Sequence, residues 1–157
     1  MKLVIMRHGQ AEVLSKPDET RALTALGKQQ VSDASNWLAK KLGEKTKIDL
    51  ALVSPFLRTQ QTYDELFSVV NVVKKIDAPD VVPNGDPALF HDYLDTLISQ
   101  TPAFKTILII SHMPFVCYFL EEINKSKKSM LFDTSSTVVF EYNPVDRNGI
   151  RGDTFHP

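Results

Sequence analysis

Two histidines stand beside residues that could help them act on an anion. His8 lies between Arg7 and Gly9, and a second histidine, His112, directly follows Ser111. An arginine keeps its positive charge and donates paired hydrogen bonds to phosphate oxygens. A neutral imidazole is a nucleophile near pH 7 and can accept a phosphoryl group as a phosphoramidate. These residue types indicate phosphoryl transfer, provided that the fold brings the two histidines together.

Both histidines are predicted to lie at the ends of strands. Apolar runs rich in β-branched residues precede them at residues 2–6 and 106–110. Such runs are typical of buried strands in a parallel sheet, and an open α/β sheet binds its ligands at the carboxyl ends of its strands. One such histidine alone would be explained by an ordinary loop or a hydrogen-bonded buried side chain. Two matched junctions favour one shared site.

Strands and helices alternate along most of the 157 residues. Helical periodicity and capping residues predict helices at 24–42, 56–69, 87–100 and 114–124. Further strands are predicted at 49–53, 81–82, 137–142 and 150–155, and a polar loop without regular structure at 10–21. We therefore expect one domain over residues 1–157, with a three-layer α/β/α fold. Its sheet would be mainly parallel, with an antiparallel hairpin at the C-terminal edge.

Two further arginines are predicted to reach the carboxyl edge of this sheet. Arg58 lies in the first turn of the helix that follows the second predicted strand, and Arg21 ends the polar loop after the first. Together with Arg7 they would form a pocket for a dianionic phosphoryl group. Charge stabilisation and positioning account for most of the catalysis in phosphoryl transfer.

The two histidines are expected to have different roles in that pocket. His8 is the better nucleophile, because Arg7 would neutralise the incoming phosphate and Gly9 would leave room for its close approach. His112, on the opposing loop, would donate a hydrogen bond to an equatorial oxygen. Asp86, by contrast, suits the N-cap of the helix that follows it.

Composition and the remaining cysteine and histidines exclude several other function classes. The net charge of −1 does not support nucleic-acid binding, and no apolar stretch is long enough for a signal peptide or a membrane span, so a cytoplasmic protein is expected. The single cysteine, Cys117, lies in an apolar stretch and is expected to be a buried small side chain. Zinc is the alternative for two histidines, but His91 and His156 lack ligand spacing and neighbouring arginines would repel a cation. We expect neither a metal nor another cofactor.

Four motifs in this order resemble those of the histidine phosphatase superfamily, also called the phosphoglycerate-mutase-like or RHG family. They are Arg7-His8-Gly9, the stretch from Arg21 to Gln30, the stretch from Val53 to Thr62, and Ser111-His112. The resemblance covers most of the chain and implies a phosphoglycerate-mutase-like fold and a metal-independent phosphatase. It further implies that His8 is the phosphate-accepting nucleophile, that Arg7, Arg58 and His112 bind the phosphate, and that Arg21 is an additional pocket residue.

Within the superfamily the chain is most similar to the short, SixA-type phosphohistidine phosphatases. Many other members carry an acidic proton donor after the third strand and an insertion that covers the site, whereas this chain has no such insertion. Asp86 is the acid near that position, and Asp18 is a second candidate. An uncovered pocket would admit a phosphorylated side chain on a folded protein, and a neutral imidazole leaving group needs little help from an acid.

The resemblance implies that the substrate is phosphohistidine on a signalling or phosphotransfer protein, such as a histidine phosphotransfer domain or a phosphotransferase-system protein. Inorganic phosphate would be the product, and neither nucleic acid nor a membrane would be a partner. A small-molecule phosphomonoesterase of the same family is an alternative, as is a phosphoryl-binding module without turnover. A mutase is less compatible, because returning the phosphoryl group to a substrate requires a closed site that excludes water.

Overall fold

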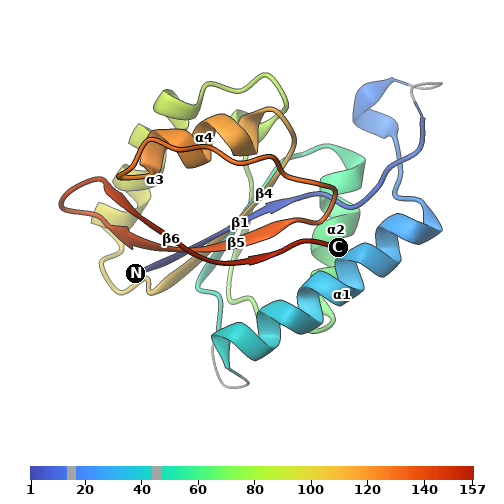
Figure 1. The fold of residues 1–157 in the computed structure, drawn as a ribbon, viewed down its shortest axis with the longest axis horizontal. Coiled ribbons are helices and arrows are strands. Elements are labelled where there is room, and N and C mark those ends of the chain that lie inside the picture. Colours follow the sequence, from blue (N-terminus) through green and yellow to red (C-terminus); the bar gives the residue numbers. More distant parts are fainter. Residues whose placement is uncertain (14–16, 44–46) are drawn as a thin grey trace.

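The computed structural model describes residues 1–13, 17–43 and 47–157, in which a six-stranded sheet lies between two pairs of helices (Figure 1). The strands are β1 (Lys2–Arg7), β2 (Leu50–Val53), β3 (Lys75–Asp77), β4 (Thr106–Ser111), β5 (Thr137–Asn143) and β6 (Asn148–Phe155). The helices are α1 (Ala25–Leu42), α2 (Leu57–Phe67), α3 (Pro87–Gln100) and α4 (Phe115–Ile123), with short 3-10 helices at Asp18–Thr20 and Pro79–Val81.

The order of the strands in the sheet is β3-β2-β4-β1-β5-β6. The first four strands in that order run parallel to one another, β5 runs antiparallel to β1, and β6 runs antiparallel to β5. The mainly parallel sheet and the antiparallel hairpin at its C-terminal edge confirm the predicted fold class.

The central strands are apolar at consecutive positions because helices cover both faces of the sheet. In β1, Leu3 and Ile5 belong to the core beneath α3 and α4, whereas Val4 and Met6 belong to the core beneath α1 and α2. Figure 1 shows these two helix pairs on opposite sides of the sheet. Successive side chains of a strand point to opposite faces, so a doubly covered strand has no polar face.

The ends of two helices confirm the predicted caps. The Thr24 hydroxyl oxygen accepts a hydrogen bond from the Gly27 amide at 3.0 Å, and α1 ends at Gly43, whose φ of 87° lies in the left-handed region that favours glycine. At the start of α3, the Asp86 carboxylate accepts hydrogen bonds from two amides of the first turn, with Pro87 at the first position.

The third predicted strand, at residues 81–82, is wrong. The pairing strand is β3, at Lys75–Asp77, and Val81 instead ends a 3-10 helix and is buried. Pro79 and Pro83 flank the two valines, and proline has no amide to donate to a sheet. Among the described residues β3 pairs only with β2, so it lies at the edge of the sheet. Its three residues include one apolar side chain, too few to predict a strand from the sequence.

The first loop contains a short helical turn. Within the loop predicted at residues 10–21, Asp18–Thr20 form a 3-10 turn, whereas Lys16 lies outside the described residues.

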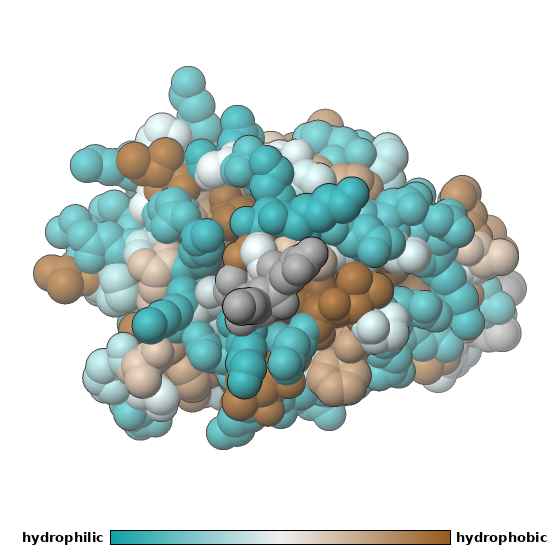
Figure 2. All heavy atoms as spheres, turned by 90° about the horizontal axis from the view of Figure 1, so that it is seen from below, coloured by the Kyte–Doolittle hydropathy of each residue, from teal (hydrophilic) through white to brown (hydrophobic). Residues whose placement is uncertain are grey.

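Figure 2 shows the face on the α1 side, where hydrophilic side chains predominate and apolar ones gather in small groups. Among the described residues, no helix combines the length and the apolar character needed to cross a bilayer.

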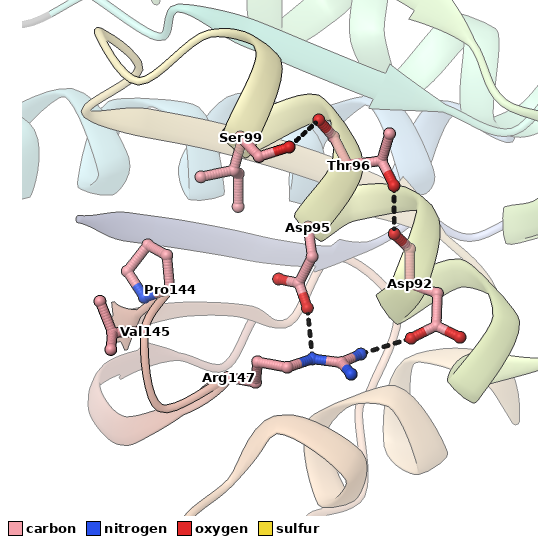
Figure 3. Close-up of a pocket in the computed structure, with 8 residues that line it drawn as sticks. Asp92, Asp95, Thr96, Ser99, Pro144, Val145 and Arg147 are labelled. Carbon is pink, nitrogen blue, oxygen red and sulfur yellow. Dashed lines mark hydrogen bonds and ion pairs between the residues drawn. The ribbon is translucent and has the colours of Figure 1, made fainter.

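A charged network fixes the β5–β6 hairpin to α3. Arg147, in the hairpin turn, contacts Asp92 and donates a hydrogen bond through Nε to Asp95 at 2.6 Å (Figure 3). The Tyr142 hydroxyl also donates to Asp95, at 2.6 Å, and its oxygen lies 2.8 Å from Nε2 of His91. These contacts account for the burial of His91 in α3 without a role in chemistry.

Candidate active site

The pairing of β1 with β4 brings the two predicted histidines together. Arg7 is in register with Ser111, so the residues that follow them leave the sheet side by side. The His8 amide donates to the Ser111 carbonyl at 3.0 Å, and the imidazole rings of His8 and His112 lie 5.0 Å apart between centroids. Both side chains are buried. One site at the carboxyl edge of the sheet therefore contains both histidines.

Hydrogen bonds at both ring nitrogens fix the tautomer of His8. Its Nδ1 lies 2.7 Å from the Gly9 carbonyl oxygen, which can only accept, so Nδ1 carries the proton. Its Nε2 accepts a hydrogen bond from Nε of Arg58 at 3.1 Å. Nε2 therefore carries no proton, and its lone pair points toward Arg58. Nε2 is the nitrogen available to attack a phosphorus atom.

Both imidazoles are neutral near pH 7. Burial lowers the pKa of His8 to about 3, and the positive charges of Arg58 and Arg7 act in the same direction, against the hydrogen bond to the Gly9 carbonyl. Burial also lowers the pKa of His112, to about 2, with smaller contributions from His8 and the arginines. A neutral imidazole retains the lone pair that nucleophilic attack requires.

The arginines predicted from the sequence lie around one cavity of about 490 Å³. Arg7, Arg21 and Arg58 line it together with His8, and the ring of His112, which is not among the lining residues, lies 5.0 Å from that of His8. The Arg7 Nη1 donates to the Phe132 carbonyl at 2.7 Å and so is held by the chain segment that precedes β5. Its Nε is buried without a hydrogen-bond partner in the described structure, which leaves a donor for a ligand.

Asp18 holds two of these arginines in place. Its carboxylate accepts hydrogen bonds from Nε of Arg21 at 2.9 Å and from Nη2 of Arg58 at 3.1 Å. Its carbonyl oxygen accepts a further hydrogen bond from Nη1 of Arg58 at 2.6 Å. Burial alone would raise the pKa of Asp18, but the two arginines hold it below its ordinary value. Asp18 is therefore an anion at neutral pH.

The charges around the cavity suit a phosphoryl group. Three guanidinium groups and the Asp18 carboxylate line it, which leaves two positive charges when the histidines are neutral. A phosphoryl dianion carries two negative charges. Guanidinium groups in a partly buried site stabilise such an anion far more strongly than they would in water.

His112 is oriented by a serine that the sequence analysis did not single out. Nε2 of His112 lies 2.7 Å from the Ser54 hydroxyl, at the end of β2. Its Nδ1 is buried without a hydrogen-bond partner in the described structure. If the Ser54 hydroxyl donates to Nε2, then Nδ1 carries the proton and can donate to a phosphoryl oxygen. Ser54 belongs to the quoted stretch from Val53 to Thr62, so the signal was present, but its partner could not be read from the sequence.

The space beside Gly9 has a different use from the predicted one. A Cβ atom at Gly9 would lie 2.6 Å from the Gly27 carbonyl oxygen and 2.8 Å from Val31, both in α1. The missing side chain therefore lets α1 pack against the loop after β1, rather than making room for a ligand. The Gly9 amide donates to the Thr62 hydroxyl at 3.2 Å, which ties the loop to α2 as well.

Comparison with known proteins places this site in a family. No family model matches the chain. The chain is 36% identical over 137 residues to the phosphohistidine phosphatase SixA of Escherichia coli K12, covering 87% of this chain and 82% of the relative. The chain belongs to the SixA family of the histidine phosphatase superfamily. It is also 31% identical to the SixA homolog of Haemophilus influenzae, over 84% of this chain and 82% of the relative.

Solved structures agree with this membership of the SixA family. The structure of the protein histidine phosphatase SixA complexed with tungstate matches with a TM-score of 0.89 at 31% identity, over 99% of this chain and 96% of that chain. Tungstate is a tetrahedral oxyanion, as phosphate is. The alpha-ribazole phosphatase from Shigella flexneri matches with a TM-score of 0.70 at 16% identity, over 97% and 95% of the two chains. The second match shows the shared fold alone.

The two acids considered from the sequence take different places in this SixA-family chain. Asp86 does not line the cavity; its exposed carboxylate caps α3 through the amides of Ala88 and Leu89. Asp18 is the one acid among the described residues that line the cavity. The sequence analysis ranked these acids in the opposite order, because Asp86 stands near the position of the acid in other superfamily members, whereas the fold of the loop around Asp18 could not be read from the sequence.

Proposed function

We propose that this chain is a metal-independent phosphatase that hydrolyses phosphohistidine on a signalling or phosphotransfer protein. The observation that carries the proposal is the geometry at His8: Nδ1 is committed to the Gly9 carbonyl, while Nε2 faces the Arg58 guanidinium with its lone pair. An arginine beside a nucleophile can pass its hydrogen bond to the incoming phosphoryl oxygen. The same guanidinium group then stabilises the charge that develops during transfer.

The reaction would proceed in two displacements. Nε2 of His8 attacks the phosphorus atom, a new P–N bond forms, and the P–N bond of the substrate breaks, releasing its imidazole. Water then attacks the phosphorus atom of phosphorylated His8, so that inorganic phosphate leaves and His8 regains its neutral form. Arg7, Arg58 and His112 would hold the phosphoryl oxygens in both steps, with Arg21 as an additional cation.

The acids of the site support phosphohistidine rather than a phosphate ester as the substrate. Asp18 has a lowered pKa and is ionised at neutral pH, so it is a poor proton donor. An alkoxide leaving group needs an acid, whereas the imidazole of phosphohistidine can leave as a neutral molecule when its distal nitrogen is protonated. A site with cations and an ionised carboxylate suits the second kind of leaving group.

The shape of the site supports a protein substrate. The cavity is bordered by half-buried side chains, including Gln10, Pro83 and Met113, and opens at the surface at the end of the sheet. We propose that residues 1–157 act as one domain without an inserted lid. Candidate substrates are a histidine phosphotransfer domain and a phosphotransferase-system protein. The names of the SixA relatives support the same class.

The test is turnover by the wild type and by His8→Ala on a phosphorylated histidine phosphotransfer domain, on a phosphorylated phosphotransferase-system protein and on p-nitrophenyl phosphate, without added metal. We expect rapid loss of phosphohistidine by the wild type and a decrease of at least about 1,000-fold in His8→Ala. His156→Ala, which removes a histidine outside the cavity, is the matched control. Faster cleavage of p-nitrophenyl phosphate than of either phosphoprotein would instead make this a small-molecule phosphatase.

A further inference from the structure

A second cavity, of about 440 Å³, adjoins the catalytic one. Met113 lines both. The other side chains of the second cavity come from the N-cap of α4, from α4 itself and from the chain segment after it, and most are apolar. We call it the methionine groove; its lining residues are Met113, Pro114, Cys117, Tyr118, Glu121, Ser129, Met130 and Leu131.

The wall of the methionine groove is attached directly to the phosphate-binding site. Figure 1 shows the segment after α4 running back along that helix toward the carboxyl end of the sheet. The Ser129 hydroxyl donates to the Cys117 carbonyl at 2.8 Å and holds the segment against α4. The next anchor is Phe132, whose buried ring packs in the core while its carbonyl accepts the hydrogen bond from Arg7. Nη1 of Arg7 also lies 3.3 Å from the sulfur atom of Met113.

Two large side chains of the groove remain in contact with water. Tyr118, from α4, is 58% exposed, and Leu131, from the segment after α4, is 77% exposed. Removing apolar surface from water is favourable, so a partner that covers these side chains gains binding energy. Tyr118 and Glu121 also line a third hollow, at the start of α3, so the recessed surface continues beyond the groove.

We propose that the methionine groove binds the apolar surface that surrounds the phosphohistidine of the substrate protein. This inference rests on the proposed function, because it concerns where the same substrate docks. His8 is buried, so a substrate protein that places its phosphohistidine against it must lay its own surface over the rim of the cavity. The groove adjoins that rim, because Met113 lines both cavities, and most of its lining side chains are apolar. Methionine side chains adapt to the shape of the apolar surface that they contact, which suits Met113 and Met130 to a docking surface.

The test separates docking from chemistry by using two substrates. Leu131→Gln and Tyr118→Ala are compared with the wild type on a phosphorylated histidine phosphotransfer domain and on phosphoramidate, which is too small to reach the groove. Both changes are uncharged, so they do not alter the field at Arg7. Val145→Gln is the matched control, because Val145 is 90% exposed and lies in the β5–β6 turn, outside both cavities.

We expect the KM for the phosphoprotein to rise about tenfold in each groove variant, as for a contact residue of moderate importance. The values of kcat/KM for phosphoramidate should stay within about twofold of the wild type, and Val145→Gln should change neither. An unchanged KM for the phosphoprotein would overturn the docking proposal while leaving the proposed function intact. An equal loss on both substrates, or conversion of a dimer to a monomer by Leu131→Gln, would also overturn it. No turnover of either substrate by the wild type would instead refute the proposed function.

Discussion

The Nε of Arg58 donates a hydrogen bond to Nε2 of His8 over 3.1 Å, so the guanidinium group and the lone pair that would attack phosphorus face each other. The contact joins the first turn of α2 to the end of β1. Arg58 is itself held by the carboxylate and the carbonyl of Asp18. The orientation of the guanidinium group, and not only its charge, is therefore fixed before a substrate arrives.

Arg58→Lys tests whether that orientation matters. A lysine keeps the positive charge but has one ammonium group, which cannot replace the separate donors to His8 and Asp18. We expect kcat for phosphohistidine hydrolysis to fall by about 100-fold or more, as when one donor to a transition state is removed. Arg151→Lys, at an exposed position of β6, is the control for the same substitution. A loss of less than threefold in Arg58→Lys would mean that charge alone is needed.

The lowered pKa values of His8 and His112 predict a specific pH dependence. Burial lowers the pKa of His8 to about 3, whereas a histidine in the unfolded chain titrates near 6.5. Between these values the unfolded chain binds a proton that the folded chain does not. Neutral, buried His8 therefore destabilises the fold only below about pH 6.5. The free energy of unfolding has its full value above that pH, and it decreases progressively as the pH falls toward 3. His112 acts in the same direction.

Two measurements check this behaviour. Nuclear magnetic resonance of the phosphate-free protein should show both imidazoles still neutral at pH 5, and the urea midpoint should fall between pH 7 and pH 5. The variant His8→Asn, which has no group to titrate, should show a smaller fall. A titration of the His8 ring near pH 6.5 in the folded protein would contradict the account of a buried, neutral nucleophile.

Asp18→Asn tests the charge balance of the cavity. Removing the carboxylate leaves Arg21 and Arg58 without their anionic partner, so an inorganic anion should bind more tightly. We expect the inhibition constant of inorganic phosphate to fall by about tenfold, an effect of the size expected for one partly screened charge. Turnover should slow because phosphate leaves later and because Arg58 is less well oriented. Weaker phosphate inhibition would show that Asp18 acts mainly by holding the arginines in place.

Asp18→Asn and a second variant, Asp86→Asn, test which acid donates a proton to the leaving group. If Asp18 donated a proton to the leaving group, Asp18→Asn would reduce cleavage of p-nitrophenyl phosphate and of phosphoramidate to different extents. Asp86→Asn provides the comparison, because an asparagine can still cap α3 and Asp86 lies outside the cavity. We expect Asp86→Asn to retain its activity on both substrates. A selective loss on one of them would restore Asp86 as a candidate acid.

The sequence predicted most of the fold because the main elements depend on local signals. The apolar runs of β1 and β4, the Thr24 cap and the Pro87 start of α3 are each visible within a few residues. β3 was missed because an edge strand needs few apolar side chains, and Val81 packs into the core from a 3-10 turn instead of a strand.

The candidate site was predictable only in part, for a related reason. His8, Arg7, Arg58 and His112 stand next to strand ends or helix starts, so the topology alone brings them together. The contacts of Asp18 depend on how an irregular loop folds back over α2, and the sequence has no pattern that predicts this fold. The methionine groove likewise depends on how the irregular segment after α4 folds back against that helix.

The central claim is that His8 accepts the phosphoryl group at Nε2. It is tested most directly by mixing the wild type with a ³²P-labelled phosphohistidine protein, quenching within milliseconds in alkali, and locating the label by peptide mapping. We predict transient labelling of His8, bonded through Nε2, and no labelled enzyme in His8→Ala. Turnover without a labelled enzyme, or a label on another residue, would contradict the account.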